Sequence, residues 1–269
     1  MPEVHDGEHL GRDRWYGGMT ATMGRYMAAA MQQGASFSPA DLSSLVLWLD
    51  ASVTGSITHS GGVVSAWADQ SSAGNDFDTV VSGGPTTNSR TQNSLNVLDF
   101  TPNDDIGVVS VINSNPESSG MTIFLVGITD NTTSCALFAE GDTVTNNSNL
   151  WVGSASGNWH LTWRSGSTGG VSITGTASTT TASVVTAQID VPANGAFVRV
   201  NGSVDSSTAS YTAEGSLTLT NTAVGGLIRL SNTLFMNGWV GEVIVCNTVT
   251  GSTDIASTES YLNTKWSIY

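Results

Sequence analysis

An acidic side chain, Glu242, lies within the apolar run GWVGEVIVCN, residues 238–247. Side chains alternate between the two faces of a strand, so this carboxylate is expected to have apolar neighbours on its own face and behind it. One face should carry Val240, Glu242, Ile244 and Cys246, and the other Trp239, Val243 and Val245. A charge in such a place must be paired, hydrogen-bonded or functional, and the functional alternative is a catalytic acid.

Three tryptophans, at positions 151, 159 and 163, lie close together in the sequence. In NWHLTW, residues 158–163, alternation places Trp159 and Trp163 on one face, with Leu161 between them. That face is expected to be core, because tryptophan is mostly buried. An aromatic platform with polar groups beside it could bind a sugar, including an acidic glycan. The candidates for carbohydrate binding are Trp151, His160 and Arg164.

Two polar loops carry oxygen ligands of the kind that calcium prefers. The candidates are Asp69, Asn75 and Asp76 in the first loop, and Asn103, Asp104 and Asp105 in the second. No EF-hand spacing is present, and Asp and Asn are also common in ordinary turns. Turn chemistry is the favoured interpretation of both loops, and a calcium site is the alternative.

Other catalytic chemistry has no matching pattern in the sequence. The four histidines, at positions 5, 9, 59 and 160, lack the spacing of a zinc site. The sequence has no Gly-x-Ser-x-Gly elbow, no histidine next to either cysteine, and no Gly-x-x-x-x-Gly-Lys phosphate loop. We therefore predict no catalytic residues.

The elements that position these side chains are expected to be strands. The chain has 269 residues, of which 39% are hydrophobic and only 11% charged, and Ser, Thr, Asn and Gly replace the missing charge. This composition suits short strands and many turns. The formal net charge of −14 argues against non-specific nucleic-acid binding, which needs a basic surface.

Export, membrane insertion and disulfide bonding are not indicated by the sequence. The first residues, MPEVHDGEHLGRDRWYGG, lack the apolar core of a signal peptide, and no run of 18 apolar residues could span a membrane. Two cysteines make no disulfide framework. Cys135 and Cys246 are expected to be unpaired and buried, with a bridge between them as the alternative.

About a dozen expected strands, at intervals near ten residues, favour an all-β antiparallel sandwich of two sheets. The segments expected to be strands include residues 45–49, 95–100, 121–129, 135–140, 149–154, 158–163, 183–190, 196–202, 216–220, 225–230 and 235–247. Asn201-Gly202 is a type I′ hairpin signal. The tail, residues 252–266, is expected to be helical, with Ile255, Leu262 and Trp266 on one stripe.

The composition changes near residue 37. Methionines recur every four residues from Met19 to Met31, which would place them on one stripe of a short helix. Such an adaptable stripe is typical of a partner contact. We therefore expect an anchoring arm, residues 1–37, followed by the sandwich domain, residues 38–269. The residues expected to anchor the arm are Arg14, Trp15, Tyr16, Met23, Met27 and Met31.

The order of motifs resembles the concanavalin A-like lectin/glucanase sandwich in its laminin G-like form. Four pieces carry the resemblance: LVLWLDAS followed by GGVVSAWADQSSAGNDF, LNVLDF followed by NDD, AFVRVNGSV, and MNGWVGEVIVCNTV followed by STESYLNTKW. The similarity runs from about residue 39 to residue 269. It implies a two-sheet jelly roll that often binds carbohydrate and sometimes calcium, and such domains are familiar in structural proteins of tailed bacteriophages. The fold by itself implies no activity.

The resemblance also bears on the acidic residues. Glucanases of this fold carry a Glu-x-Asp-x-(x)-Glu strand, whose two glutamates flank the scissile bond. Here EGDTVT begins such a pattern at Glu140, but Val144 and Thr145 stand where the second glutamate should be. Glu242 is similar to the structural glutamate of the family's closing strand. It is therefore expected to be a buried carboxylate paired with Arg229, Lys265 or a tryptophan N–H.

These features together favour a non-enzymatic structural protein of a phage virion, assembled in the host cytoplasm and located on the capsid or tail surface. The arm would bind other virion proteins, and the protein would form a homo-oligomer or multi-copy assembly that binds host-surface glycan through its sandwich. Neutral glycans are expected, because a net charge of −14 repels strongly anionic ones. The alternative is a capsid or tail decoration (cement) protein that binds no sugar, and a glycoside hydrolase is the third class.

Overall fold

The computed structural model describes residues 36–108, 110–112, 119–164, 170–211 and 218–269. Residues Ser38–Tyr269 form one compact unit. The residues expected to anchor the arm, from Arg14 to Met31, lie outside the described part of the chain.

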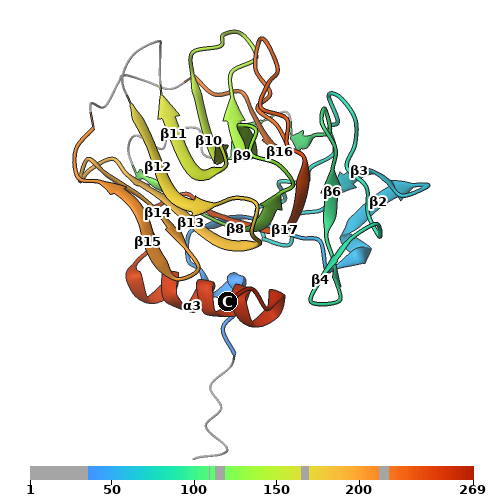
Figure 1. The fold of residues 1–269 in the computed structure, drawn as a ribbon, viewed down its shortest axis with the longest axis horizontal. Coiled ribbons are helices and arrows are strands. Elements are labelled where there is room, and N and C mark those ends of the chain that lie inside the picture. Colours follow the sequence, from blue (N-terminus) through green and yellow to red (C-terminus); the bar gives the residue numbers. More distant parts are fainter. Residues whose placement is uncertain (1–35, 109, 113–118, 165–169, 212–217) are drawn as a thin grey trace, which may run out of the picture. The chain divides into compact units, whose positions relative to one another are not determined.

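Two antiparallel sheets make up the body of this unit (Figure 1). The seven-stranded sheet has the order β1-β17-β8-β13-β14-β15, with β6 paired to β17, and the six-stranded sheet has the order β12-β11-β10-β9-β16-β7. Two hairpins, β2-β3 and β4-β5, flank them. The strands are β1 (Leu45–Asp50), β2 (Ile57–Ser60), β3 (Val63–Trp67), β4 (Thr91–Gln92), β5 (Leu95–Asn96), β6 (Leu98–Phe100), β7 (Ile106–Val108), β8 (Met121–Thr129), β9 (Cys135–Gly141), β10 (Asn149–Ala155), β11 (Asn158–Arg164), β12 (Val171–Ser178), β13 (Ser183–Asp190), β14 (Gly195–Val200), β15 (Ser203–Thr208), β16 (Asn221–Val224) and β17 (Gly238–Cys246).

The apolar faces of the two sheets form one core between them. Alternation along each strand turns every second side chain inward, which is the packing expected of a sandwich. The seven-stranded sheet contributes Leu47, Leu49, Ile123, Leu125, Val185, Ala187, Val243 and Val245, and the six-stranded sheet contributes Leu150, Val152, Trp159, Leu161 and Trp163. The expected two-sheet all-β sandwich is confirmed.

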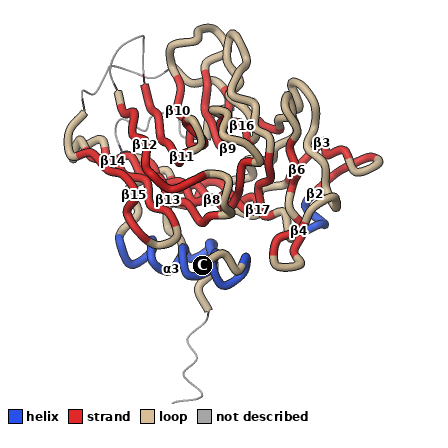
Figure 2. Tube along the Cα trace, viewed as in Figure 1, coloured by secondary structure: helices blue, strands red, loops and turns tan. Residues whose placement is uncertain are grey.

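The C-terminal helix, α3 (Ser252–Trp266), covers the outer face of the seven-stranded sheet (Figure 2). Its buried stripe includes Ile255, Leu262 and Trp266, as the sequence predicts. Glu259 is also buried. Hydrogen bonds from Arg199 on β14 and Thr186 on β13 offset the cost of burying its charge. Charged contacts therefore hold the helix to the sheet alongside the apolar stripe.

Tight turns follow the predicted chemistry where Asn and Gly occur. Asn201 and Gly202 have φ values of 50° and 79° and join β14 to β15, as a type I′ turn requires. The Asn-Gly prediction is therefore confirmed.

Some predicted strands are different in the structure. Residues 225–230 are a loop, because Gly225 has a φ of 90° and a Cβ there would lie 2.4 Å from the ring of Phe100. Residues 218–220, the described part of the predicted strand 216–220, are also not a strand, and β16 begins only at Asn221. Residues 95–100 divide into β5 and β6.

The cysteines and the helices give two further observations. Cys135 and Cys246 are both buried and unpaired. Within the described ranges, no helix combines the length and the apolar composition needed to cross a bilayer.

Candidate functional site

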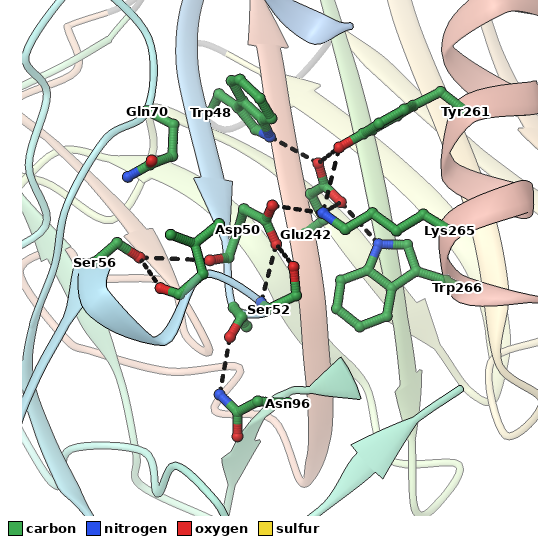
Figure 3. Close-up of polar contacts among 12 residues, drawn as sticks. Trp48, Asp50, Ser52, Ser56, Gln70, Asn96, Glu242, Tyr261, Lys265 and Trp266 are labelled. Carbon is green, nitrogen blue, oxygen red and sulfur yellow. Dashed lines mark hydrogen bonds and ion pairs between the residues drawn. The ribbon is translucent and has the colours of Figure 1, made fainter. Parts of the chain in front are cut away.

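Glu242 is fully buried and accepts four hydrogen bonds (Figure 3). Its Oε1 accepts from the indole N–H of Trp48 at 2.7 Å and from the hydroxyl of Tyr261 at 3.1 Å. Its Oε2 accepts from Lys265 Nζ and from the indole N–H of Trp266, both at 2.8 Å. Because Glu242 is 0% exposed and these groups surround it, its carboxylate cannot reach a substrate.

Lys265 connects Glu242 to a second buried carboxylate, Asp50. Asp50 also accepts hydrogen bonds from the backbone N–H and the hydroxyl of Ser52. Burial, followed by the negative charge of Asp50, raises the pKa of Glu242, whereas Lys265 opposes that effect. Two carboxylates thus share one ammonium group, and the cluster joins β1, β17 and α3.

A β-bulge at Gly241 places Glu242 on the helix side of β17. The pairing register of β17 with β8 shifts between Val240 and Glu242, so these two side chains point to opposite faces. Val240 packs in the core between the sheets. The prediction that Val240 and Glu242 share a face is therefore wrong. A Cβ at Gly241 would lie 3.0 Å from the Trp266 ring, so glycine allows that indole to approach Glu242.

The candidates for carbohydrate binding lie in one groove of about 340 Å³ on the outer face of the six-stranded sheet. Residues of strands β10, β11 and β12 line it, and residues of the loop between β16 and β17, here called the wall loop, also line it. Trp151, His160 and Arg164 come together there. The remaining lining residues are Ser134, Asn149, Ala155, Thr162, Ser172, Leu227, Arg229, Thr233 and Leu234.

Trp151 is partly exposed and lies against His160, with ring centroids 4.5 Å apart and planes inclined by 32°. The imidazole is held by the Thr174 hydroxyl at 2.7 Å from Nδ1 and by the Thr162 hydroxyl on Nε2. Burial lowers the pKa of His160 to about 4, so the imidazole is neutral at neutral pH. His160 therefore supports the indole and adds no positive charge to the groove.

Positive charge in the groove comes from Arg164 on β11 and Arg229 on the wall loop. Arg229 is fixed by hydrogen bonds from Nε to the Ser231 carbonyl at 3.1 Å and from Nη1 to the Asn146 carbonyl at 2.9 Å. Burial, followed by the charge of Arg164, lowers the pKa of Arg229. The two guanidinium groups are thus close enough to repel each other.

Asn149 lies directly opposite Arg164 in the pairing of β10 with β11. Asn149 is 1% exposed, yet its Nδ2 has no hydrogen-bond partner among the described residues. Arg164 Nε is also buried and has no hydrogen-bond partner among the described residues. Asn149 was not singled out from the sequence, although alternation places it on the face of Trp151, because its position opposite Arg164 depends on strand register. Arg229 was proposed only as a partner of Glu242, because the wall loop was predicted to be a strand.

The tryptophans at 159 and 163 are core residues, with 0% and 1% exposure. Their side chains point away from the groove, into the space between the sheets. Trp151 is therefore the one of the three clustered tryptophans that a ligand could contact.

The first predicted calcium loop is a network of turn hydrogen bonds. The Asp69 carboxylate accepts from the backbone N–H of Trp48, Ser71 and Asn75 at 2.8–2.9 Å. Asn75 donates its side-chain N–H to the Val46 carbonyl, and the Asp76 carboxylate accepts from the Asp69 N–H.

The second predicted calcium loop is similar. Asp104 accepts from the Thr101 N–H at 2.6 Å, and the buried Asp105 accepts from the Val81 and Ser82 N–H groups. Asn103 takes a φ of 84°, which a turn asparagine tolerates. Among the residues that the structure describes, no three His, Cys, Asp or Glu side chains are grouped so that they could hold a metal ion.

Comparison with known proteins identifies related folds and no related sequence family. No protein-family model and no curated protein sequence matches the chain. The binding domain of botulinum neurotoxin serotype D/C matches with a TM-score of 0.58 and 14% identity, over 84% of this chain and 53% of that chain. A botulinum neurotoxin type C structure matches with a TM-score of 0.56 and 14% identity, over 81% of this chain and 51% of that chain.

A sialidase, NanB from Streptococcus pneumoniae, is also similar, with a TM-score of 0.49 and 15% identity over 60% of this chain and 27% of that chain. That similarity is too weak to carry an argument about function. The chain spans about half the length of the neurotoxin chains that it matches. At these identities, the comparisons establish the sandwich fold alone.

Proposed function

We propose that this protein is a non-enzymatic, carbohydrate-binding structural protein that binds a glycan in the groove over β10, β11 and β12. The observation that carries the proposal is the partly exposed Trp151 ring within a groove of polar side chains. An aromatic face packs against the apolar face of a sugar ring, while nearby hydrogen-bonding groups fix its hydroxyls. Both kinds of group are present on this face of the sheet.

The groove supports binding more than hydrolysis. Glycoside hydrolysis uses two carboxyl groups, about 5 to 9.5 Å apart, on either side of the scissile bond. The residues that line this groove include no Asp or Glu. The buried Glu242 is enclosed by α3 and belongs to a different face of the molecule.

The shared fold makes glycans the first ligands to test. The botulinum neurotoxin type C is described as entering cells through interaction with two ganglioside molecules, which are glycan-bearing lipids. Sugars are strongly hydrated, and a shallow groove buries little area, so a single site should bind no tighter than about 10 µM. Many copies on one particle would raise the effective affinity.

The larger biological role is a further part of the proposal. We infer that the laminin G-like sandwich is displayed on the capsid or tail surface of a phage virion, anchored to other virion proteins by residues 1–37. The support is the motif resemblance over residues 39–269 and the composition of the preceding segment, which is rich in Met and Arg. Multi-copy display would suit a weak adhesive site.

A glycan array probed with the multimerised full-length protein, with and without calcium, tests the binding function. Trp151→Ala should weaken the strongest interaction at least tenfold, which corresponds to about 1.4 kcal/mol. Tyr269→Ala is the matched control, because it removes an exposed aromatic ring that does not line the groove. Silence across neutral and acidic glycans, combined with particles that lose integrity without the protein, would contradict adhesion and favour a decoration role.

A further inference from the structure

We propose that the ligand of this groove is an acidic saccharide whose carboxylate is bound by Arg164 and Arg229, with Asn149 as an additional donor. The proposal rests on the proposed glycan-binding function and names the chemical class of its ligand. It reverses the expectation of neutral glycans that follows from the net charge of −14.

The cations of the described chain fall into two groups. Three are neutralised by carboxylates: Arg90 by Asp99 and Asp130, Arg199 by Glu259, and Lys265 by Asp50 and Glu242. The other two, Arg164 and Arg229, form no ion pair with any described residue, and both line the same groove. In a strongly acidic chain, this groove is a local concentration of unneutralised positive charge.

Without a bound ligand, this arrangement of charges and donors lowers the stability of the protein. The two guanidinium groups repel each other, and the charge of Arg164 adds to burial in lowering the pKa of Arg229. One nitrogen of the Arg164 guanidinium, Nε, and the Nδ2 of Asn149 on the paired strand are buried and have no acceptor among the described residues. A buried donor without an acceptor costs folding free energy, so a bound anion would remove several unfavourable features at once.

Carboxylate geometry suits these donors. A planar carboxylate accepts two parallel hydrogen bonds from the fork of an arginine, and Arg164 presents its Nε with no competing partner in the described chain. Arg229 uses Nε and Nη1 for backbone carbonyls, which fixes the group in place. Its Nη2 makes no hydrogen bond to a described residue.

The sugar ring and its acidic group fit two adjacent places along the sheet. Trp151 and Thr162 form one cross-strand pair, and Asn149 and Arg164 form the next pair on the same face. Two residues along a strand correspond to about 7 Å. A single pyranose could therefore rest on Trp151 while its carboxylate reaches the arginines.

The acidic surface does not prevent such binding. At physiological ionic strength, the Debye length is about 8 Å, so charges on distant parts of the surface are largely screened. The charges of Arg164 and Arg229 act at contact distance and are partly buried, so they are screened less. The local groups therefore decide the preference for the ligand.

Matched oligosaccharides test this inference on the full-length protein. The probes are trigalacturonic acid and its carboxyl-reduced counterpart, sialyllactose and lactose, and a sulfated disaccharide, each titrated by calorimetry. We expect at least one carboxylated probe to bind tenfold or more tightly than its neutral counterpart. Arg164→Gln should remove that preference, whereas Arg90→Gln, which removes the same charge outside the groove, should retain it.

The outcomes separate this inference from the proposed function. Equal binding of carboxylated and neutral probes, unchanged by Arg164→Gln, would overturn the carboxylate assignment and leave glycan binding intact. Binding of the sulfated probe alone would also overturn it, in favour of a different anion. No binding of any probe, neutral or acidic, would contradict both proposals. Arg229→Gln is a second variant, but Arg164→Gln is the decisive one because the Arg164 side chain makes no described hydrogen bond whose loss could unfold the chain.

Discussion

At the scale of single residues, some side chains that line the groove lower the stability of the folded protein. Arg164 has a like charge nearby, and neither its buried Nε nor the amide nitrogen of Asn149 has a hydrogen-bond partner among the residues that the structure describes. A bound ligand, as proposed above, would satisfy these groups.

Arg164→Met should therefore stabilise the unliganded protein. Methionine keeps most of the side-chain length but removes the unpaired donor and the charge, so we expect a gain of about 1 kcal/mol in the free energy of unfolding. Urea denaturation at pH 7 measures this difference. Arg90→Met is the control, because it loses two partly exposed ion pairs and should lower stability by about 1 kcal/mol. A loss of stability in Arg164→Met would show that Arg164 supports the fold.

His160 should make stability depend on pH between about 4 and 6.5. Its pKa is lowered by burial to about 4 in the folded protein, whereas the unfolded chain protonates near 6.5. The neutral imidazole thus contributes stability fully above pH 6.5, and that contribution is lost as the pH falls toward 4. From pH 7 to pH 4.5 the loss should be about 2–3 kcal/mol.

Urea midpoints measured across this pH range in His160→Gln and His59→Gln provide the check. The first variant should lose the His160 contribution to the slope, while the second, which removes an exposed histidine on β2, should retain it. Identical slopes in both variants would contradict the assignment.

At the scale of elements, the Glu242 cluster fixes α3 to the sheet. Glu242→Gln should destabilise the protein by about 3 kcal/mol, because Lys265, Trp48, Trp266 and Tyr261 lose a buried charged acceptor. Thermal or urea denaturation measures the loss. Asp78→Asn is the matched control, since this carboxylate is exposed and, among the described residues, accepts a hydrogen bond only from the neighbouring Thr79 hydroxyl. An unchanged melting temperature in Glu242→Gln would contradict the clamping role.

The elements also show what the sequence could and could not predict. The strand of Met121–Thr129 and the helix of Ser252–Trp266 were predictable, because their apolar runs and spacing are strong local signals. Strand β12 was missed although Val171–Ser178 alternates apolar and polar residues, because Gly175 and the small polar side chains weaken its strand propensity. Propensity is weak where packing against a neighbouring strand decides the outcome.

The candidate site was predictable only in part. Trp151, His160 and Arg164 could be chosen because two neighbouring strands and simple alternation bring them to one face. Arg229 could not, since the wall loop depends on the close packing of Gly225 against Phe100. Alternation places Asn149 on the face of Trp151, but its position opposite Arg164 depends on the register between the strands. The bulge at Gly241 similarly left no local signal beyond the glycine itself.

At the scale of the whole molecule, we expect two separate roles: the sandwich binds the ligand, and the arm attaches the protein to particles. Deletion of residues 1–37 should leave a folded sandwich, because the core residues lie within Ser38–Tyr269. The truncated protein should no longer join particles, because it lacks the proposed anchoring arm. Circular dichroism with thermal denaturation tests folding, and co-sedimentation with particles tests incorporation. Full-length protein is the control. Unfolding of the truncated chain would show that the arm belongs to the core.

Lys265 is the sole lysine of the chain, and its side chain is only 17% exposed within the cluster of Asp50 and Glu242. Acylating reagents that target lysine, and proteases that cleave after it, should therefore act slowly at this position while α3 is packed on the sheet, and faster when it lifts. The rate of such a reaction would report the opening of the helix without any engineered label. The reactivity of Lys265 thus shows whether the C-terminal helix is attached to the sheet.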